Sequence, residues 1–335
     1  MAVLEVKDLR IYYRTLKGYA QAVDGVSFQI EEGEYLGLVG ESGCGKSTIA
    51  KAILRILPPN GEIMGGAILF NGQDLVSMKS SDLKKIQWKE ISMVPQSAMY
   101  SFDPVYRIED QLLEAIETHE KTTREVALSK IRELFGLVGL NEKRLKDYPH
   151  QFSGGMRQRA MIAMALTLDP TLIIADEATT GLDVIVQDQI LYRIKEIHEK
   201  MKKTMLLITH NMAVVAENCD KIGVMYAGKI MEYGGESVFL NPYHPYTLGL
   251  VNAFPSLTDT GRELISIPGY PPSLLNPPKG CRFHDRCPFT KEECVKEEPL
   301  LRLVAEKHFS ACHYPDQVDR FRDLAQKPET WAKRE

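Results

Sequence analysis

The stretch GESGCGKST, residues 40–48, decides the fold of this 335-residue chain. It matches the pattern G-x-x-x-x-G-K-[ST], in which glycines let backbone N–H groups wrap phosphate oxygens at the N-terminus of a helix. The apolar run YLGLV (35–39) precedes the stretch, and the helical pattern KSTIAKAILRIL (46–57) follows it. This order of strand, loop and helix favours a nucleotide-binding loop over a glycine-rich turn that binds nothing.

The side chains of this loop predict contacts with ATP and Mg²⁺. Lys46 would reach the β- and γ-phosphates, and the hydroxyl of Ser47 would ligate Mg²⁺. Neighbouring loop residues would surround the same phosphates with their backbone and side chains. These residues are Gly40, Ser42, Gly43, Cys44, Gly45 and Thr48.

A pair of carboxylates ends the apolar run TLIIADE (171–177). An Asp at the end of a strand near a phosphate-binding loop is placed to hold Mg²⁺, directly or through water, and Asp176 takes this role. Glu177 would then face the γ-phosphate and polarise the attacking water as a general base. The alternative is that both acids only stabilise the start of a helix. The loop at residues 40–48 favours the catalytic interpretation.

Apolar runs and helical patterns alternate over the first 235 residues, which predicts an α/β core. Short apolar runs suit buried parallel strands, and pairs of runs around Asn-Gly or Ala-Gly suit hairpins. A helical insertion is expected over about residues 97–165, because no strand candidate interrupts the helical spacing there. The expected strands are 35–40, 91–95, 171–176 and 205–210, and the expected hairpins are 67–75 and 221–235.

Composition predicts a globular protein of a reducing compartment. The apolar fraction of 44% and the charged fraction of 26% are ordinary, and the net charge of −4 gives no general attraction to nucleic acid. No apolar run reaches the ~18 residues of a membrane span, and the stretch MAVLEVKDLRIYY (1–13) is too charged for a secretory signal. Disulfides are therefore not expected.

The region after residue 235 is rich in proline, which predicts an irregular or extended tail with little core. Four cysteines in it have the spacing C-x₅-C-x₆-C-x₁₇-C, at Cys281, Cys287, Cys294 and Cys312. A tetrahedral zinc site is one interpretation, but the usual C-x₂₋₄-C pairs are absent. A [4Fe–4S] cluster tolerates varied spacing and suits the Cys-Pro pair at 287–288. We favour the cluster, as a structural crosslink, over zinc and over a metal-free site.

The stretch FSGGMRQR (152–159) is similar to the LSGGQ signature of ATP-binding-cassette (ABC) ATPases. Together with the phosphate loop and the Asp-Glu strand end, it extends this resemblance over residues 1–235 as an ABC ATPase domain. The motifs NPYHPYT (241–247) and GCRFHDRCPF (280–289) resemble the C-terminal region of oligopeptide/dipeptide importer ATPases, here residues 236–335. The resemblance implies an α/β fold of the P-loop NTPase kind. It would have a mixed sheet, flanking helices, a helical subdomain and an irregular metal-binding tail.

Further site residues follow from the resemblance. In the family an aromatic residue stacks on adenine, and Tyr13 takes this position, with Tyr12 as the neighbouring candidate. Gln96 resembles the glutamine that contacts Mg²⁺ and senses the transmembrane partner, and His210 resembles the histidine that contacts the γ-phosphate. Asp183 resembles the aspartate that communicates between two subunits. The signature residues that would contact ATP bound to the other subunit are Ser153, Gly154 and Gly155.

The resemblance implies an ATP-hydrolysing subunit that powers import of peptides or a similar solute through a membrane transporter. Its expected partners are a second ABC ATPase subunit, related but different in sequence, two transmembrane permease subunits and, indirectly, an extracytoplasmic solute-binding protein. The expected location is the cytoplasmic face of the cell membrane. The alternative is a soluble ABC-type ATPase that acts on ribosomes or DNA. Against it, the chain has one phosphate loop, one signature and no sustained heptads.

Overall fold

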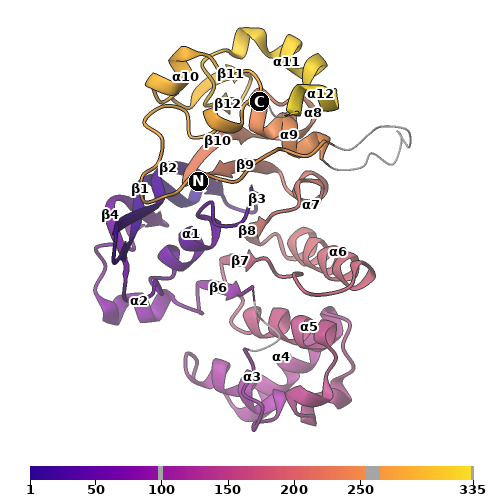
Figure 1. The fold of residues 1–335 in the computed structure, drawn as a ribbon. Coiled ribbons are helices and arrows are strands. Elements are labelled where there is room, and N and C mark those ends of the chain that lie inside the picture. The colour runs from indigo at the N-terminus through magenta and orange to yellow at the C-terminus, as the bar shows by residue number, and fades with distance from the viewer. Residues whose placement is uncertain (97–100, 254–264, 333–335) are drawn as a thin grey trace. The chain divides into compact units, whose positions relative to one another are not determined.

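The computed structural model describes residues 1–96, 101–253 and 265–332 of the chain, as Figure 1 shows. The chain folds into two compact units, and each unit is made from segments that lie far apart in the sequence. The first unit contains Met1–Val3, Ile30–Tyr35 and Ser77–Ile208, and the second contains Leu4–Gln29, Leu36–Val76 and Thr209–Glu335.

The first unit has three neighbouring parallel strands. They are β6 (Ile91–Val94), β7 (Leu172–Asp176) and β8 (Thr204–Thr209), in the spatial order β6-β7-β8. Their residues are almost entirely buried and mostly apolar, as is typical of strands in a parallel sheet. Three of the predicted strands are thereby confirmed.

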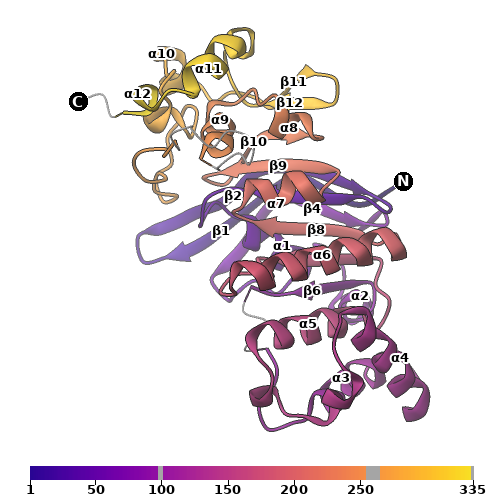
Figure 2. The same cartoon turned by 90° about the vertical axis from the view of Figure 1, so that its right-hand side faces the viewer.

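Helices make up most of the rest of the first unit. They are α2 (Ser80–Ile86), α3 (Ile108–Glu117), α4 (Arg124–Leu137), α5 (Gly154–Ala165) and α6 (Val184–Met201), with 3₁₀ turns at Glu142–Lys146 and Pro149–Gln151. In α4, apolar residues three or four positions apart form the buried face, and the Thr123 hydroxyl caps the first turn. Figures 1 and 2 show α3, α4 and α5 gathered in one group. Helices therefore fill the described part of the predicted insertion.

An antiparallel sheet of four strands lies in the second unit. Its strands are β1 (Ala2–Thr15), β2 (Gly18–Glu31), β4 (Gly61–Phe70) and β5 (Gln73–Asp74), in the order β2-β1-β4-β5. Asn71 and Gly72 have φ values of 47° and 78°, the sign that a tight hairpin turn requires at both central residues. They join β4 to β5, which confirms the first predicted hairpin.

A mixed sheet carries the phosphate-binding loop in the same unit. Its strands are β3 (Tyr35–Val39), β9 (Lys221–Tyr226), β10 (Lys229–Gly234), β11 (Arg302–Ala305) and β12 (His308–Ser310), in the order β3-β9-β10-β12-β11. β3 and β9 are parallel, and the other neighbours are antiparallel. The tight turn at Ala227 and Gly228 joins β9 to β10 and confirms the second predicted hairpin.

Short helices complete the second unit. They are α1 (Lys46–Ile53), α7 (Met212–Asn218), α8 (Ser237–Leu240), α9 (Pro245–Asn252), α10 (Glu292–Lys296), α11 (Val318–Ala325) and α12 (Pro328–Trp331), with 3₁₀ turns at His284–Arg286 and Pro315–Gln317. Across the three described ranges, no helix combines the length and the apolarity that crossing a lipid bilayer requires.

The prediction of an irregular tail after residue 235 is wrong. β12 pairs with β10, where Glu232 lies opposite Ser310, so the C-terminal region adds two strands to the mixed sheet. This region also buries large side chains of its own, including Phe283, Phe321 and Trp331. Its prolines misled the prediction because two of them, Pro245 and Pro328, start helices, where a backbone N–H is not needed.

Candidate functional site

Glycines shape the loop that connects β3 to α1. Gly43 and Gly45 have φ values of 80° and 108°, in a region of backbone conformation that favours glycine. A Cβ atom on Gly45 would lie 2.3 Å from the carbonyl oxygen of Ala22. A Cβ atom on Gly40 would lie 2.1 Å from the carbonyl oxygen of Met225. The loop therefore packs directly against neighbouring backbone, which fixes its course.

Lys46 begins α1 and is buried, with 4% of its surface exposed. Its ammonium donates hydrogen bonds to the carbonyl oxygens of Gly40 (2.7 Å) and Glu41 (3.1 Å). The first turn of α1 contains no acidic residue, so its free N–H groups and the positive end of the helix dipole are not neutralised there. Burial raises the pKa of the neighbouring Cys44 thiol, which keeps it neutral. The loop is therefore electropositive and suits a phosphate group.

Tyr13 lies beside the first turn of α1. Its hydroxyl is 3.2 Å from the hydroxyl of Thr48, within hydrogen-bond distance. Tyr12 instead donates a hydrogen bond to Asp24 (3.0 Å). Burial and the negative charge of Asp24 raise the pKa of Tyr12. Of the two aromatic candidates, Tyr13 is thus the one that contacts a residue of the phosphate-binding stretch.

The carboxylates at the end of β7 occupy contrasting environments. Asp176 is buried, with 2% of its surface exposed. Glu177 is partly exposed, and its Oε2 accepts hydrogen bonds from the side-chain amide of Gln96 (2.7 Å) and the hydroxyl of Thr180 (3.1 Å). The φ of Glu177 is 46°, and its N–H donates to the carbonyl oxygen of Ile208 (2.8 Å). The structure therefore brings together two predicted site residues, Gln96 and Glu177.

The signature stretch begins α5. Ser153 is its N-cap, and the hydroxyl accepts a hydrogen bond from the N–H of Met156 (3.3 Å). Asp183 caps α6 in the same way, through the N–H of Val186 (3.0 Å). A Cβ atom on Gly155 would lie 2.5 Å from a methyl carbon of Val186, so glycine allows the two helices to start close together. The signature and Asp183 are thus neighbours.

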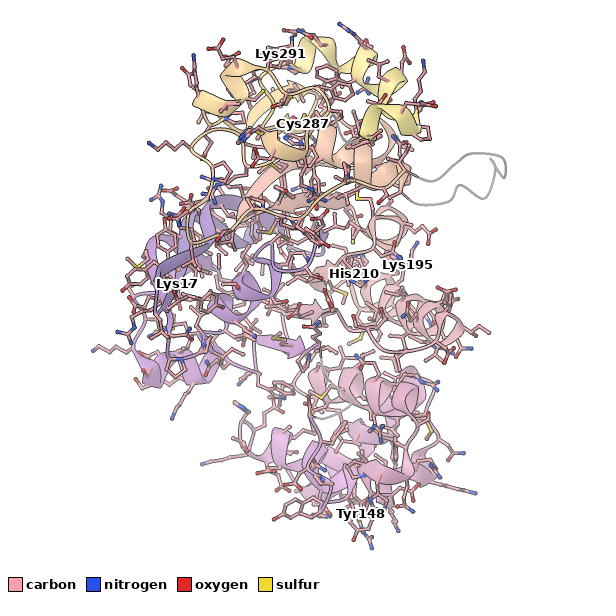
Figure 3. All side chains as sticks on the ribbon, in the orientation of Figure 1. Lys17, Tyr148, Lys195, His210, Cys287 and Lys291 are labelled. Carbon is pink, nitrogen blue, oxygen red and sulfur yellow. The ribbon has the colours of Figure 1, made fainter. Side chains whose placement is uncertain are left out.

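The predicted nucleotide residues divide between the two units. His210 is exposed and directly follows β8 (Figure 3). The second unit holds Tyr13, Gly40, Ser42, Gly43, Cys44, Gly45, Lys46, Ser47, Thr48 and His210, and the first holds Gln96, Ser153, Gly154, Gly155, Asp176, Glu177 and Asp183.

Two family models match the chain. The model described as ABC transporter matches residues 23–180, and the model described as oligopeptide/dipeptide transporter, C-terminal region, matches residues 231–294. The chain is 44% identical over 315 residues to the dipeptide transport ATP-binding protein DppD of Caldanaerobacter subterraneus subsp. tengcongensis, covering 93% of this chain and 96% of that protein. It is 46% identical over 317 residues to the oligopeptide transport ATP-binding protein OppD of Escherichia coli K12, covering 94% of each. The chain belongs to the ABC transporter family, in its oligopeptide/dipeptide branch.

Solved structures of other ABC proteins share the fold of this ABC ATPase. The bacterial ABC transporter cassette MJ0796 matches with a TM-score of 0.63 and 24% identity, covering 70% of this chain and 98% of that one. The protein cbiO1 of Clostridium perfringens matches with a TM-score of 0.62 and 24% identity, covering 72% and 91%. The predicted P-loop fold with a mixed sheet and helices is thereby confirmed.

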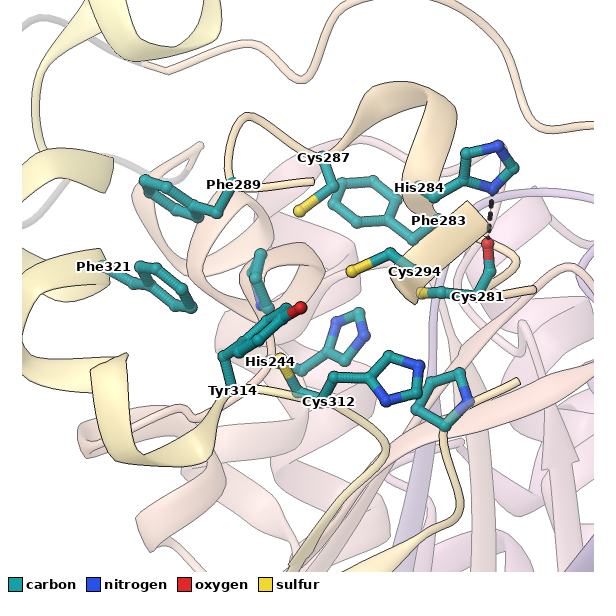
Figure 4. Close-up of a pocket in the computed structure, with 13 residues that line it drawn as sticks. His244, Cys281, Phe283, His284, Cys287, Phe289, Cys294, Cys312, Tyr314 and Phe321 are labelled. Atoms are coloured by element: carbon teal, nitrogen blue, oxygen red, sulfur yellow. Dashed lines mark hydrogen bonds between the residues drawn. The ribbon is translucent and has the colours of Figure 1, made fainter. Parts of the chain in front are cut away.

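The four cysteines in the C-terminal region of this ABC ATPase line one pocket, as Figure 4 shows. All four are free thiols. The N–H of Cys281 donates to the carbonyl oxygen of Cys294 (2.8 Å), so backbone also joins two of the segments that carry them. Aromatic rings form much of the remaining wall, contributed by Phe283, Phe289, Tyr314 and Phe321.

Burial changes the acid–base chemistry of three of these thiols. It raises the pKa of Cys281 to about 12 and that of Cys312 to about 11, and it raises the pKa of Cys287 well above the ordinary value. A metal would therefore have to displace protons from neutral thiols. Within the described parts of the chain, no three His, Cys, Asp or Glu side chains are arranged so that they could hold a metal ion.

Sequence reasoning missed the partnership between Glu41 and Arg286. Glu41 is the second residue of the phosphate-binding stretch, and Arg286 immediately precedes Cys287. The two terminal nitrogens of Arg286 lie 2.7 and 3.0 Å from the two carboxylate oxygens of Glu41. The two arginines between Cys281 and Cys287 indicated that this stretch has acidic partners. No local pattern predicts that one of these partners lies 245 residues away in sequence.

Proposed function

We propose that this chain is the ATP-hydrolysing subunit of an importer for oligopeptides or dipeptides. The observation that carries the proposal is the identity of 44% and 46% to a dipeptide and an oligopeptide transport ATP-binding protein, over 93% and 94% of the chain. The identity extends over the ATPase motifs and the C-terminal region alike. It favours an importer over an ABC ATPase that acts on ribosomes or DNA. We propose an ATPase domain over residues 1–235, with a helical subdomain at about 97–165, and a C-terminal region over 236–335.

We assign nucleotide binding to the loop at residues 40–48. The ammonium of Lys46 and the N–H groups at the start of α1 supply positive charge for the β- and γ-phosphates. Tyr13 is the proposed adenine-stacking residue, and its contact with Thr48 supports that role. Bound Mg²⁺ would neutralise phosphate charge, and its proposed protein ligands are Ser47, Gln96 and Asp176.

Glu177 is the proposed general base. Its Oε2 is held by Gln96 and Thr180, which fixes the direction of the carboxylate before a water molecule is activated. Its positive φ is a conformation that non-glycine residues adopt at a cost, and such strain is common at functional sites. His210 is the proposed contact to the γ-phosphate.

The proposed partners complete the site and the transport path. Ser153, Gly154 and Gly155 would contact ATP bound to a second, related ABC ATPase, and Asp183 would lie at the same interface. Exposed apolar side chains at Val184 and Ile185, each with 71% of its surface exposed, support an interface there. A relative of the same fold has been solved as a dimer. Two permease subunits at the cytoplasmic face of the membrane and a solute-binding protein complete the proposed importer.

We further propose that the four-cysteine pocket holds a [4Fe–4S] cluster. The chemistry of the donor set supports this, because a [4Fe–4S] cluster takes four thiolates and four free thiols line this one pocket. The chain lacks the C-x₂₋₄-C pairs usual at zinc sites, whereas a [4Fe–4S] cluster takes four thiolates at varied spacing. The side chains would have to rearrange to hold it, because no three of the described residues are placed to bind a metal ion as they stand. Its contribution would be a crosslink between the segments that carry these cysteines.

Uptake of a labelled tripeptide by cells tests the importer proposal. Cells without this chain should lose uptake, the wild-type chain should restore it, and Lys46→Ala should leave uptake at least about 10-fold lower. Uptake of a labelled free amino acid serves as the control and should not change. Full restoration by Lys46→Ala, or normal peptide uptake without the chain, contradicts the proposal.

A further inference from the structure

Arg286, in the segment 281–287, contacts Glu41 of the phosphate-binding loop. Its two terminal nitrogens donate one hydrogen bond to each carboxylate oxygen of Glu41, at 2.7 and 3.0 Å. Its side chain is 7% exposed, and that of Glu41 is 25% exposed. A bidentate arginine–carboxylate pair with little solvent has a fixed geometry as well as a charge attraction. The remaining donors of Arg286 bond to Tyr226 Oη and to the backbone carbonyls of residues 267 and 268.

The backbone of Glu41 is held from two sides. Its N–H donates a hydrogen bond to the hydroxyl of Tyr246, in α9 (3.0 Å). Its carbonyl oxygen accepts a hydrogen bond from Lys46 (3.1 Å). Both the backbone N–H and the side chain of this loop residue therefore bond to the C-terminal region.

Arg282, in the same segment, contacts the turn at Ala227 and Gly228, which in turn contacts the phosphate-binding loop. Arg282 is 4% exposed and donates to the carbonyl oxygen of Ala227 (3.2 Å) and to the carboxylate of Asp24 (2.6 Å). The next residue of the turn, Gly228, donates its N–H to the carbonyl oxygen of Cys44 (3.0 Å). Arg282 is thus linked to Cys44, in the middle of the phosphate-binding loop, through the turn at Ala227 and Gly228.

The segment that carries both arginines is itself well anchored. Phe283 is 1% exposed, and its ring centroid lies 5.3 Å from those of Tyr226 and Tyr246. Backbone hydrogen bonds from His284 to Cys281 and from Arg286 to Phe283 form a tight turn. Such a segment can hold the loop in place because it has few alternative conformations of its own.

We propose that the segment 281–287 acts as a brace, which means that it holds the phosphate-binding loop in the conformation that binds nucleotide. Arg286 is then a positioning residue for nucleotide binding. Arg286 holds Glu41 so that the loop N–H groups keep the arrangement that phosphate requires. Without this contact the loop populates other conformations. The apparent affinity for nucleotide then falls in proportion to the fraction of molecules whose loop is in the binding conformation. The inference rests on the proposed nucleotide role of residues 40–48.

Calorimetric titration of the full chain with Mg–ADP tests the brace. ADP is not hydrolysed, and its β-phosphate belongs in this loop. Arg286→Ala should weaken binding about 10-fold, and Arg286→Lys about 3-fold, because lysine keeps the charge and loses the fork. The matched control is Arg302→Ala. Arg302 lies in the same region and donates to the carbonyl oxygens of residues 312 and 313, away from the phosphate-binding loop. The affinity of this variant for Mg–ADP should therefore stay within about 2-fold of wild type.

A double-mutant cycle separates positioning from a loss of folding. Glu41→Gln should weaken binding, and adding Arg286→Ala to it should cost little more, because both changes remove one interaction. Thermal unfolding must show that every variant is folded at the assay temperature. Wild-type affinity in folded Arg286→Ala, or additive losses in the cycle, would overturn the brace. If Lys46→Ala loses affinity while Arg286→Ala keeps it, only the brace fails. If Lys46→Ala keeps affinity, the nucleotide role of the loop fails.

Discussion

The surroundings of Glu177, rather than its residue type, distinguish it from the neighbouring acid Asp176. Asp176, its neighbour in sequence, is buried at the end of β7, whereas Glu177 turns through a positive φ and presents its carboxylate to Gln96 and Thr180. The backbone turn therefore gives two adjacent acids different surroundings, which agrees with the proposed roles of metal ligand for Asp176 and general base for Glu177.

Glu177→Gln should leave Mg–ATP binding within about 2-fold and slow steady-state hydrolysis by about 100-fold or more, because the amide cannot accept the proton of the attacking water. Hydrolysis is measured with the partner subunits present, and binding is measured by titration. Thr180→Ala removes one hydrogen bond to the same oxygen and serves as the control, with a loss below about 10-fold. Near-normal hydrolysis by Glu177→Gln would rule out the role of general base.

The starts of α5 and α6 depend on one glycine. Gly155→Ala would place a methyl group 2.5 Å from Val186, so we expect a loss of about 1–3 kcal/mol in the free energy of unfolding. Adding Val186→Ala should recover part of the loss, because it removes the clashing methyl groups. Urea denaturation measures both. Gly136→Ala, in α4, is the control and should not destabilise, since a Cβ there would meet no atom within 4 Å. Equal stability of Gly155→Ala and wild type would contradict this packing.

The four-cysteine pocket should carry iron when the protein is purified without oxygen. We expect about four irons and about four sulfides per chain. Removal of the iron with a chelator should lower the thermal unfolding temperature, because a crosslink between separate segments of the chain is lost. Cys44→Ser serves as the control and should keep the iron. Stoichiometric zinc without iron would show that a different metal is bound.

The sequence predicted the elements that depend on neighbouring residues. The strand before Gly40, the parallel strands and the hairpin at Asn71 and Gly72 were all correct, because apolar runs and turn residues act locally. β11 and β12 were missed because they have four and three residues and depend on long-range pairing, β12 with β10 and β11 with β12. The same limit applied to the site: the motif residues were visible, but the contacts of Tyr13 with Thr48 and of Arg286 with Glu41 are long-range.

An ABC ATPase whose signature residues contact ATP on a partner subunit should hydrolyse ATP slowly when it is alone. We expect the purified chain to bind Mg–ATP, to hydrolyse it slowly and to be mostly monomeric, and we expect its rate to rise at least about 10-fold when the partner ATPase and permeases are added. Val184→Glu should reduce this stimulation, because it places a charge at the proposed interface, whereas Tyr192→Glu, farther along α6, is the control. A stable dimer of the isolated chain with full activity would contradict the proposal.

The bond between Glu41 and Arg286 also sets an order of events during synthesis. A ribosome that has just added Glu41 must add 245 more residues before the arginine exists. At ~5–20 residues per second, that interval is roughly 10 to 50 s. Throughout it, the nascent loop lacks its anchor, and nucleotide would bind it less tightly than it binds the finished chain. With the proposed brace, the chain reaches its full affinity for nucleotide only late, after the part of the C-terminal region that carries Arg286 has been made and has folded.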